Sequence, residues 1–212
     1  MTVDDNAPRS LRDAGVRERR RLMLDLPHAA RLTFYAAKLR ERGSIQVPDF
    51  DPLDGGVDAR VLFLFEKPGP MTAEGGRGGR SGSGFISRNN DDPTAAATFD
   101  FMQKAGMPRK LSVIWNVIPW WNGKRKLTKE ELRDGAQSVQ ELISLLPKLR
   151  AVVMVGEKAD HAARPYFKTT GLALFTSAHP SPLVRARYRS QWDAIPSEWA
   201  KVREFIDGSD AE

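Results

Sequence analysis

Four short apolar runs recur along the chain, and a polar or turn-forming residue follows each of them within a few positions. They occupy residues 61–65, 111–115, 151–155 and 172–175. Continuous apolar runs of this length are typical of strands that are buried on both faces of a parallel sheet. The sequence therefore predicts a central sheet of four parallel strands.

Segments with a helical spacing of apolar residues lie between and around these runs. The spacing predicts helices over residues 22–42, 93–105, 128–146, 157–167 and 196–206. Thr128 and Glu131 have the spacing of a capping box, which marks a helix start. Residues 43–56 are rich in Pro and Gly and are expected to be a connecting loop. Alternating strands and helices predict a three-layer α/β/α fold with right-handed crossovers.

The length of 212 residues favours a single domain with a substantial core. We assign residues 22–207 to this domain, residues 1–21 to a basic, mobile N-terminal arm that leads into a helix, and residues 208–212 to a C-terminal tail. The arm carries Arg17, Arg19, Arg20 and Arg21. Arginines at this density are typical of a solvated face, with phosphate contact as the alternative.

Charge and composition narrow the function classes. The net charge of +6 is compatible with a polyanionic partner such as DNA. The chain has no Cys, which excludes disulfides, thiolate nucleophiles and Cys-ligated zinc or iron–sulfur clusters. No apolar run is long enough for a transmembrane helix, and the first 20 residues lack the apolar core of a secretory signal. We therefore expect a cytoplasmic protein without membrane contact, metal or cofactor, and take a monomer as the default.

Polar side chains lie where three of the predicted strands end. Glu66 follows the first run, Asn116 follows the second, and His179 comes shortly after the fourth. Ligands of open parallel sheets bind beyond the carboxyl ends of the strands, so the fold would bring these groups together. Structural alternatives exist: Glu66 could cap a loop, and Asn116 could bond its own backbone in a turn. His179 differs from His28 and His161, because it opens a rigid His-Pro-Ser-Pro-Leu turn.

Four motifs, in this order, resemble those of the uracil-DNA glycosylase superfamily over about residues 58–206. They are Glu-Lys-Pro-Gly-Pro at residues 66–70, Phe85 after a glycine-rich loop, Asn116, and the turn at residues 179–183. The resemblance implies the fold of that superfamily. It also implies an enzyme of base excision repair that flips uracil out of DNA and hydrolyses its N-glycosidic bond.

The chemistry of the base pocket follows from these residue types. Phe85 would supply an aromatic face, since stacking is worth about 1–3 kcal/mol per base. An ordinary core side chain is the alternative, which the Gly/Ser loop before Phe85 weakens. The amide of Asn116 donates and accepts, which matches uracil O4 and N3–H and opposes cytosine. His179 would donate to uracil O2 as negative charge develops on the leaving base. Lys67 and Pro68 complete the substrate-binding set.

The motifs leave the water-activating group open. Lys67 stands where the resemblance to several branches implies Asp or Asn, and a lysine cannot act as a carboxylate there. Glu66 matches the carboxylate of the iron–sulfur branches, although the absence of Cys points to a branch without a cluster. We assign Glu66 to positioning or activating water, or to stabilising the cationic sugar. A Schiff base from Lys67 is an alternative. Other candidates for the water ligand are Asn89, Asn90, Asp91 and Asp92.

Basic and apolar residues around the motifs are expected to contact the DNA. Leu183 or Val184 could fill the space that the flipped base leaves, and the arginines suit phosphate contacts, with solvated side chains as the alternative. The predicted DNA-binding residues are Arg80, Arg88, Ser181, Pro182, Leu183, Val184, Arg185 and Arg187.

Three other functions fit the same sequence. A glycosylase for another deaminated base, hypoxanthine or xanthine, is compatible with the unusual first motif. A catalytically silent binder of uracil-containing or abasic DNA is compatible with Lys67 in place of a carboxylate. A phosphate-binding hydrolase of nucleotides would need more acidic metal ligands than Asp91 and Asp92 provide.

Overall fold

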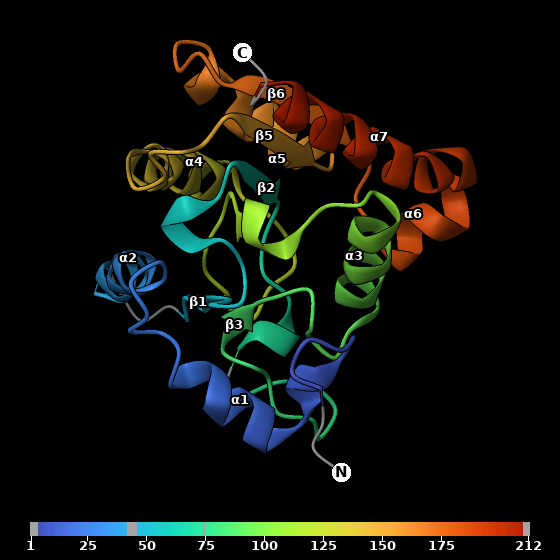
Figure 1. Ribbon diagram of the computed structural model, residues 1–212. Coiled ribbons are helices and arrows are strands. Elements are labelled where there is room, and N and C mark those ends of the chain that lie inside the picture. Colours follow the sequence, from blue (N-terminus) through green and yellow to red (C-terminus); the bar gives the residue numbers. More distant parts are fainter. Residues whose placement is uncertain (1–3, 42–45, 74, 210–212) are drawn as a thin grey trace.

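A sheet of four parallel strands in the order β4-β2-β5-β6 forms the centre of the protein (Figure 1). The computed structural model describes residues 4–41, 46–73 and 75–209. The predicted parallel sheet is confirmed, with strands close to their predicted positions. The strands are β2 (Val61–Phe65), β4 (Ser112–Asn116), β5 (Ala151–Val155) and β6 (Ala173–Ser177).

The two edge strands of the sheet, β4 and β6, differ in burial. Every residue of β2, β4 and β5 is buried, which explains why these strands read as continuous apolar runs. The edge strand β6 is buried only at Ser177. Val61 pairs with both Ser112 and Ala151, so β2 lies in the interior of the sheet between β4 and β5.

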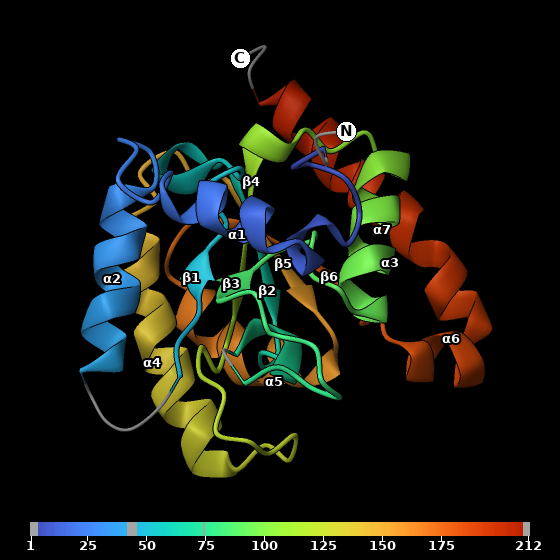
Figure 2. The ribbon, with the colours of Figure 1, turned by 90° about the horizontal axis from the view of Figure 1, so that it is seen from below.

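Helices cover both faces of the sheet. In both ribbon views α2 and α4 lie on one side, and α3 and α7 lie on the other (Figures 1 and 2). The short helix α5 packs against α4 and β5. These layers confirm the predicted α/β/α architecture. The helices are α2 (Ala30–Arg40), α3 (Pro93–Lys104), α4 (Lys129–Ser144), α5 (Glu157–Ala163), α6 (Pro182–Arg187) and α7 (Arg189–Gly208).

Two helices differ from their predicted bounds. α2 begins at Ala30 and not at residue 22, because residues 22–29 form turns around Pro27, which has no N–H to donate. α7 begins at Arg189, well before the predicted start. The prediction placed Pro196 in the first turn, where proline is favoured, but Pro196 lies inside the helix.

A second, two-stranded parallel sheet pairs β1 (Asp49–Phe50) with β3 (Phe85–Ile86). The predicted loop over residues 43–56 is wrong at β1, whose two residues are too few to give a strand pattern. Phe50 stacks on Trp115 of β4, with ring centroids 3.6 Å apart. This stacking covers the edge of the main sheet and brings β3 beside the carboxyl end of β4.

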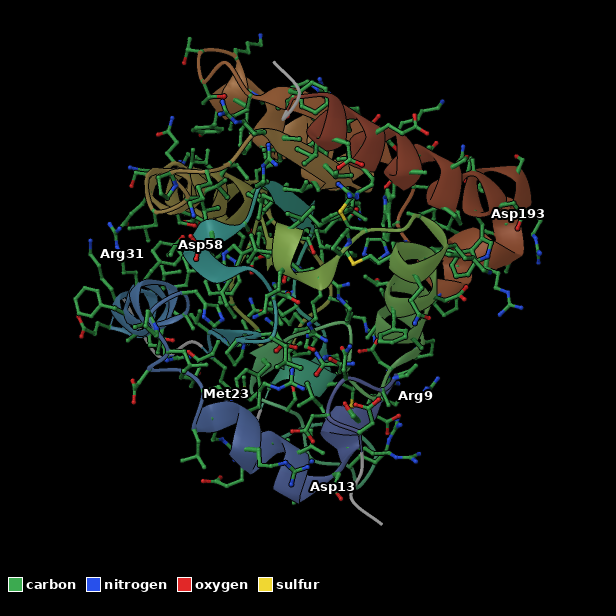
Figure 3. The ribbon with its side chains drawn as sticks, viewed as in Figure 1. Arg9, Asp13, Met23, Arg31, Asp58 and Asp193 are labelled. Atoms are coloured by element: carbon green, nitrogen blue, oxygen red, sulfur yellow. The ribbon has the colours of Figure 1, made fainter. Side chains whose placement is uncertain are left out.

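The N-terminal segment, defined here as residues 4–21, packs against the domain. Its helix α1 (Ala14–Arg21) lies across β1 and β3 in Figure 2, and Arg9 and Asp13 mark the segment in Figure 3. Leu11 and Val16 form a small buried cluster with Phe85. The prediction of a mobile arm is therefore wrong for this segment.

Arg20, in the last turn of α1, contradicts the predicted solvated face. It is fully buried and forms an ion pair with Asp51. Arg19 and Arg21 are exposed, as predicted. The domain limits at residues 21 and 207 stay a prediction, and residues 1–3, 42–45 and 210–212 lie outside the described residues.

Candidate active site

A cavity of about 400 Å³ opens at the carboxyl edge of the sheet. Lys67 and Pro68 follow β2, Asn116 ends β4, and His179 follows β6, and all four line this cavity. The parallel topology causes this meeting, because every strand of the sheet ends at the same edge. Asn116 and His179, which lie far apart in sequence, are thereby brought together.

Asn116 presents its amide to the cavity. The residue is buried, and its backbone pairs with Phe65 of β2. Its side chain has no hydrogen-bond partner among the residues that the structure describes. An Asn amide offers two donors and an acceptor oxygen, so both functions are available to a ligand.

His179 presents a neutral imidazole. Burial lowers the pKa of His179 to about 4, so the ring is uncharged at neutral pH and carries a proton on one nitrogen. The ring stands edge-on to Phe65, with centroids 5.5 Å apart, and has no hydrogen-bond partner in the described part of the chain. The N–H of Ser181 donates to the His179 carbonyl at 2.7 Å, which fixes the turn after β6.

Lys67 is held at the cavity wall by an ion pair. Its Nζ lies 2.5 Å from Oε1 of Glu131 and donates to Oδ1 of Asn122 at 2.9 Å. Glu131 also belongs to the confirmed capping box of α4. Burial raises the pKa of Glu131, but hydrogen bonds from Lys67 and Thr128 outweigh it and lower the pKa overall. The engaged ammonium counts against a Schiff base, which needs a free amine.

Glu66 does not line the cavity. Burial raises the pKa of Glu66, while the ammonium and the backbone N–H of Lys158, in the first turn of α5, oppose the shift. The N-cap of α5 is Gly156, which has no side chain to cap the helix. This position beside the start of α5 and outside the cavity lining favours the structural alternative for Glu66, and its role in water activation stays a prediction.

Phe85 points away from the cavity. Its side chain is 1% exposed and packs with Leu11 and Val16, whereas the next residue, Ile86, lines the cavity. Successive side chains of a strand point to opposite sides, so the start of β3 decides which one faces the cavity. The predicted base stacking by Phe85 is wrong. The aromatic side chain of the cavity wall is Phe65, which the sequence could not separate from an ordinary core residue.

Arg88 is buried, which contradicts its predicted DNA contact. Its Nη2 donates to Oγ of Ser112 at 2.8 Å, and it forms an ion pair with Asp54 at 3.6 Å. With 5% of its side chain exposed, Arg88 contributes to the cavity wall but is not an exposed arginine of the kind predicted for a phosphate contact. Arg80 is exposed at the cavity rim, where it pairs with Asp91 at 3.0 Å.

Two further exposed arginines, Arg77 and Arg125, line the cavity. Arg125 was not predictable from the sequence, because it lies within a polar Lys-Arg-Lys stretch that is typical of a solvated loop.

Helix α6 follows the histidine turn and borders the cavity at Pro182. Oγ of Ser181 accepts a hydrogen bond from the N–H of Val184 at 3.3 Å and caps the helix. Leu183 is 57% exposed. Arg185 and Arg187 are also exposed, and the Arg185 guanidinium lies 5.8 Å from the Trp192 ring centroid. The corner between α6 and α7, where Asp193 is labelled, lies on the right in Figure 3.

Within residues 4–41, 46–73 and 75–209, no group of three or more His, Asp or Glu side chains is arranged to hold a metal ion. None of the helices that the structure describes is both long and apolar enough to cross a membrane.

Comparison with known proteins agrees with this geometry. A family model described as the Uracil DNA glycosylase superfamily matches residues 52–202. A search of curated proteins gives no match. The matched span contains all four strands of the main sheet together with Asn116 and His179, and leaves the N-terminal segment outside. The chain therefore belongs to the uracil-DNA glycosylase superfamily, a family of DNA glycosylases.

Proposed function

We propose that the protein is a uracil-DNA glycosylase that flips uracil out of DNA and hydrolyses its N-glycosidic bond, leaving an abasic site for base excision repair. One observation carries the proposal. Asn116 and His179 line the same cavity, and neither side chain has a hydrogen-bond partner among the described residues. Asn116 is buried and His179 is half-buried. Polar groups withdrawn from solvent are normally satisfied, so this pair is suited to a polar ligand.

Asn116 would read the base. Its Nδ2 donates to uracil O4 and its Oδ1 accepts from N3–H. Cytosine offers a donor at position 4 and an acceptor at N3, so the same amide would face two unmatched groups. A polar site rejects such a mismatch strongly, because buried partners are left unpaired.

His179 would stabilise the leaving base. Breaking the bond between C1′ and N1 leaves the electron pair on uracil, with negative charge on O2, while the sugar becomes oxocarbenium-like. A fixed donor aimed at O2 is worth more in this transition state than in the ground state. Because the pKa of His179 is about 4, the donor is neutral imidazole and keeps its proton.

Exposed residues around the cavity would hold the DNA. Arg77, Arg80 and Arg125 lie at the cavity and are suited to phosphate contacts. Leu183 is the better candidate for the wedge that replaces the flipped base, since it is more exposed than Val184. Arg185 and Arg187 extend the basic surface along α6.

The test is single-turnover cleavage of a labelled oligonucleotide with one uracil, in EDTA, followed by alkali. The wild type should produce alkali-labile sites. His179→Ala should lower the rate by roughly 10²–10³, the cost of removing one preorganised donor. His161→Ala is the matched control, because His161 is exposed on α5 and does not line the cavity.

The other outcomes separate the rival functions. Excision of hypoxanthine or xanthine in place of uracil would identify another deaminated base as the substrate. Tight binding of uracil-containing or abasic DNA without cleavage would identify a silent binder. Full activity of His179→Ala would remove His179 from the mechanism.

A further inference from the structure

The loop between β3 and α3 carries four consecutive amide and carboxylate side chains, and only two of them line the cavity. Asn89 donates to the carbonyls of Asn6 and Ala7 at 3.1 and 2.8 Å, and its Oδ1 accepts from Arg109 at 2.6 Å. Asp91 pairs with Arg9 and Arg80. Both side chains bind other protein segments and lie outside the cavity lining.

Asn90 lines the cavity with one polar atom unpaired. The residue is 2% exposed, and its Nδ2 donates to the Phe85 carbonyl at 2.9 Å. A carbonyl oxygen only accepts hydrogen bonds, so the amide nitrogen must face it and Oδ1 must lie on the other side. Oδ1 is buried and has no partner among the described residues. An unpaired buried acceptor is destabilising, which favours a bound donor there.

Asp92 also lines the cavity but is engaged in the start of α3. As the N-cap residue it accepts the N–H of Ala95 at 2.9 Å. Glu66 lies outside the cavity lining, beside the start of α5, and the ammonium of Lys67 has no acceptor to offer. Among the candidates for a water ligand, Asn90 alone combines a position at the cavity with a fully buried acceptor atom that has no hydrogen-bond partner among the described residues.

We infer that Asn90 is a catalytic residue that orients the attacking water, with Oδ1 accepting a hydrogen bond from one water O–H. The inference rests on the proposed glycosylase function. The water oxygen forms a bond to C1′ while the bond between C1′ and N1 breaks and its electron pair leaves with uracil. An amide is not a base at neutral pH, so the proton of the added water passes to solvent and the uracil anion takes up a proton. Asn90 contributes orientation.

The test separates chemistry from binding and from loop structure. Asn90→Ala should lower the single-turnover rate about 10²-fold, the lower end of what a positioned proton-handling group contributes. Its affinity for DNA with a non-cleavable 2′-fluoro-2′-deoxyuridine should stay unchanged, because Oδ1 contacts water and not the base. Asn89→Ala is the matched control: it removes three hydrogen bonds from the same loop but none at the cavity. It should lower the melting temperature and leave the rate intact.

A second variant tests the acceptor itself. Asn90→Asp keeps an oxygen acceptor of the same shape and replaces the amide donor with a titratable group. Its rate should rise with pH as the new carboxyl group ionises, a dependence that the wild type lacks. A purely structural role of Asn90 predicts the opposite trend, because the protonated carboxyl group can donate to the Phe85 carbonyl and the ionised one cannot.

Each remaining outcome decides the inference. If the wild type cleaves uracil and Asn90→Ala stays within about threefold of it, the inference is wrong and the proposed function stands. Equal losses of rate and affinity, or an equal loss of rate in Asn89→Ala, would assign Asn90 a structural role. A wild type that cleaves no uracil would overturn the proposed function and this inference with it.

Discussion

Two buried polar clusters of this protein are built in opposite ways. The first, which we call the arginine–aspartate network, pairs charges with one another beneath the N-terminal segment. Arg109 forms ion pairs with both Asp51 and Asp54, and Asp51 also binds Arg20. Burial raises the pKa of Asp51, but Arg109 and Arg20 outweigh it and lower the pKa to about 2. The network members are Arg20, Asp51, Asp54, Arg88 and Arg109.

The second cluster, at the cavity, contains neutral polar groups and no ion pair between them. Asn116, His179 and Oδ1 of Asn90 have no hydrogen-bond partners among the described residues. Neither Asn116 nor His179 is charged at neutral pH, so their burial costs less than the burial of an unpaired ion. The comparison teaches that charges paired inside the protein stabilise its fold, while unpaired neutral dipoles beside a cavity are available to a ligand.

The largest expected effect belongs to Asn116, because it tests whether the cavity cluster reads a base. Asn116→Asp leaves only acceptors, which repel uracil O4 and suit the amino group of cytosine. The ratio of uracil to cytosine cleavage should fall by about 10⁴-fold, the discrimination that polar recognition typically gives. Single-turnover rates on matched single-stranded oligonucleotides measure this ratio. Asn116→Ala is the control and should lose uracil cleavage without gaining cytosine; a cytosine rate unaffected by Asn116→Asp would contradict base reading.

The next largest effect belongs to the network. Arg20→Met removes one partner of a fully buried ion pair, which typically costs about 3–5 kcal/mol of unfolding free energy. Urea denaturation measures the change. Arg19→Met is the control, because Arg19 is a neighbouring, exposed arginine that pairs with Asp5 at the surface. A loss of less than about 1 kcal/mol in Arg20→Met would show that the network does not stabilise the fold.

Both clusters also show where sequence analysis ends. The four strands were predictable because buried strands give local apolar runs in the sequence. The meeting of Asn116 and His179 was predictable because parallel strands of one sheet end at the same edge. The burial of Arg20 was not predictable, because its partner Asp51 lies 31 residues away and the two meet only in the fold. The high density of arginines around Arg20 predicted a solvated side chain instead.

The sequence also did not predict the direction in which particular side chains point. Phe85 and Ile86 are both apolar, and the pairing of β3 with β1 decides that Ile86 faces the cavity. Arg88 follows the same loop into the network, although its sequence context resembled that of a phosphate-binding arginine. Glu66 was placed correctly at a strand end, but its partner at the start of α5 comes from a distant part of the chain.

The smallest expected effect is a rate that stays constant with pH. The pKa of His179 is about 4, below its ordinary value of 6.5, so the folded protein binds its proton only in acid. Neutral imidazole is then the donor throughout the range from about pH 6 to about pH 8, and the single-turnover rate should not change with His179 protonation there. An imidazolium donor would instead lose about tenfold in rate per pH unit above its pKa. The free energy of unfolding, unlike the rate, should depend on the protonation of His179. Between about pH 6.5 and about pH 4 the unfolded state binds more protons than the folded state. The wild type should therefore lose stability as the pH falls through this window, and His179→Ala should lose less. A rate that falls steadily from pH 6 to pH 8 would show that His179 acts as a cation, and the cavity cluster would then hold a charge, as the network does.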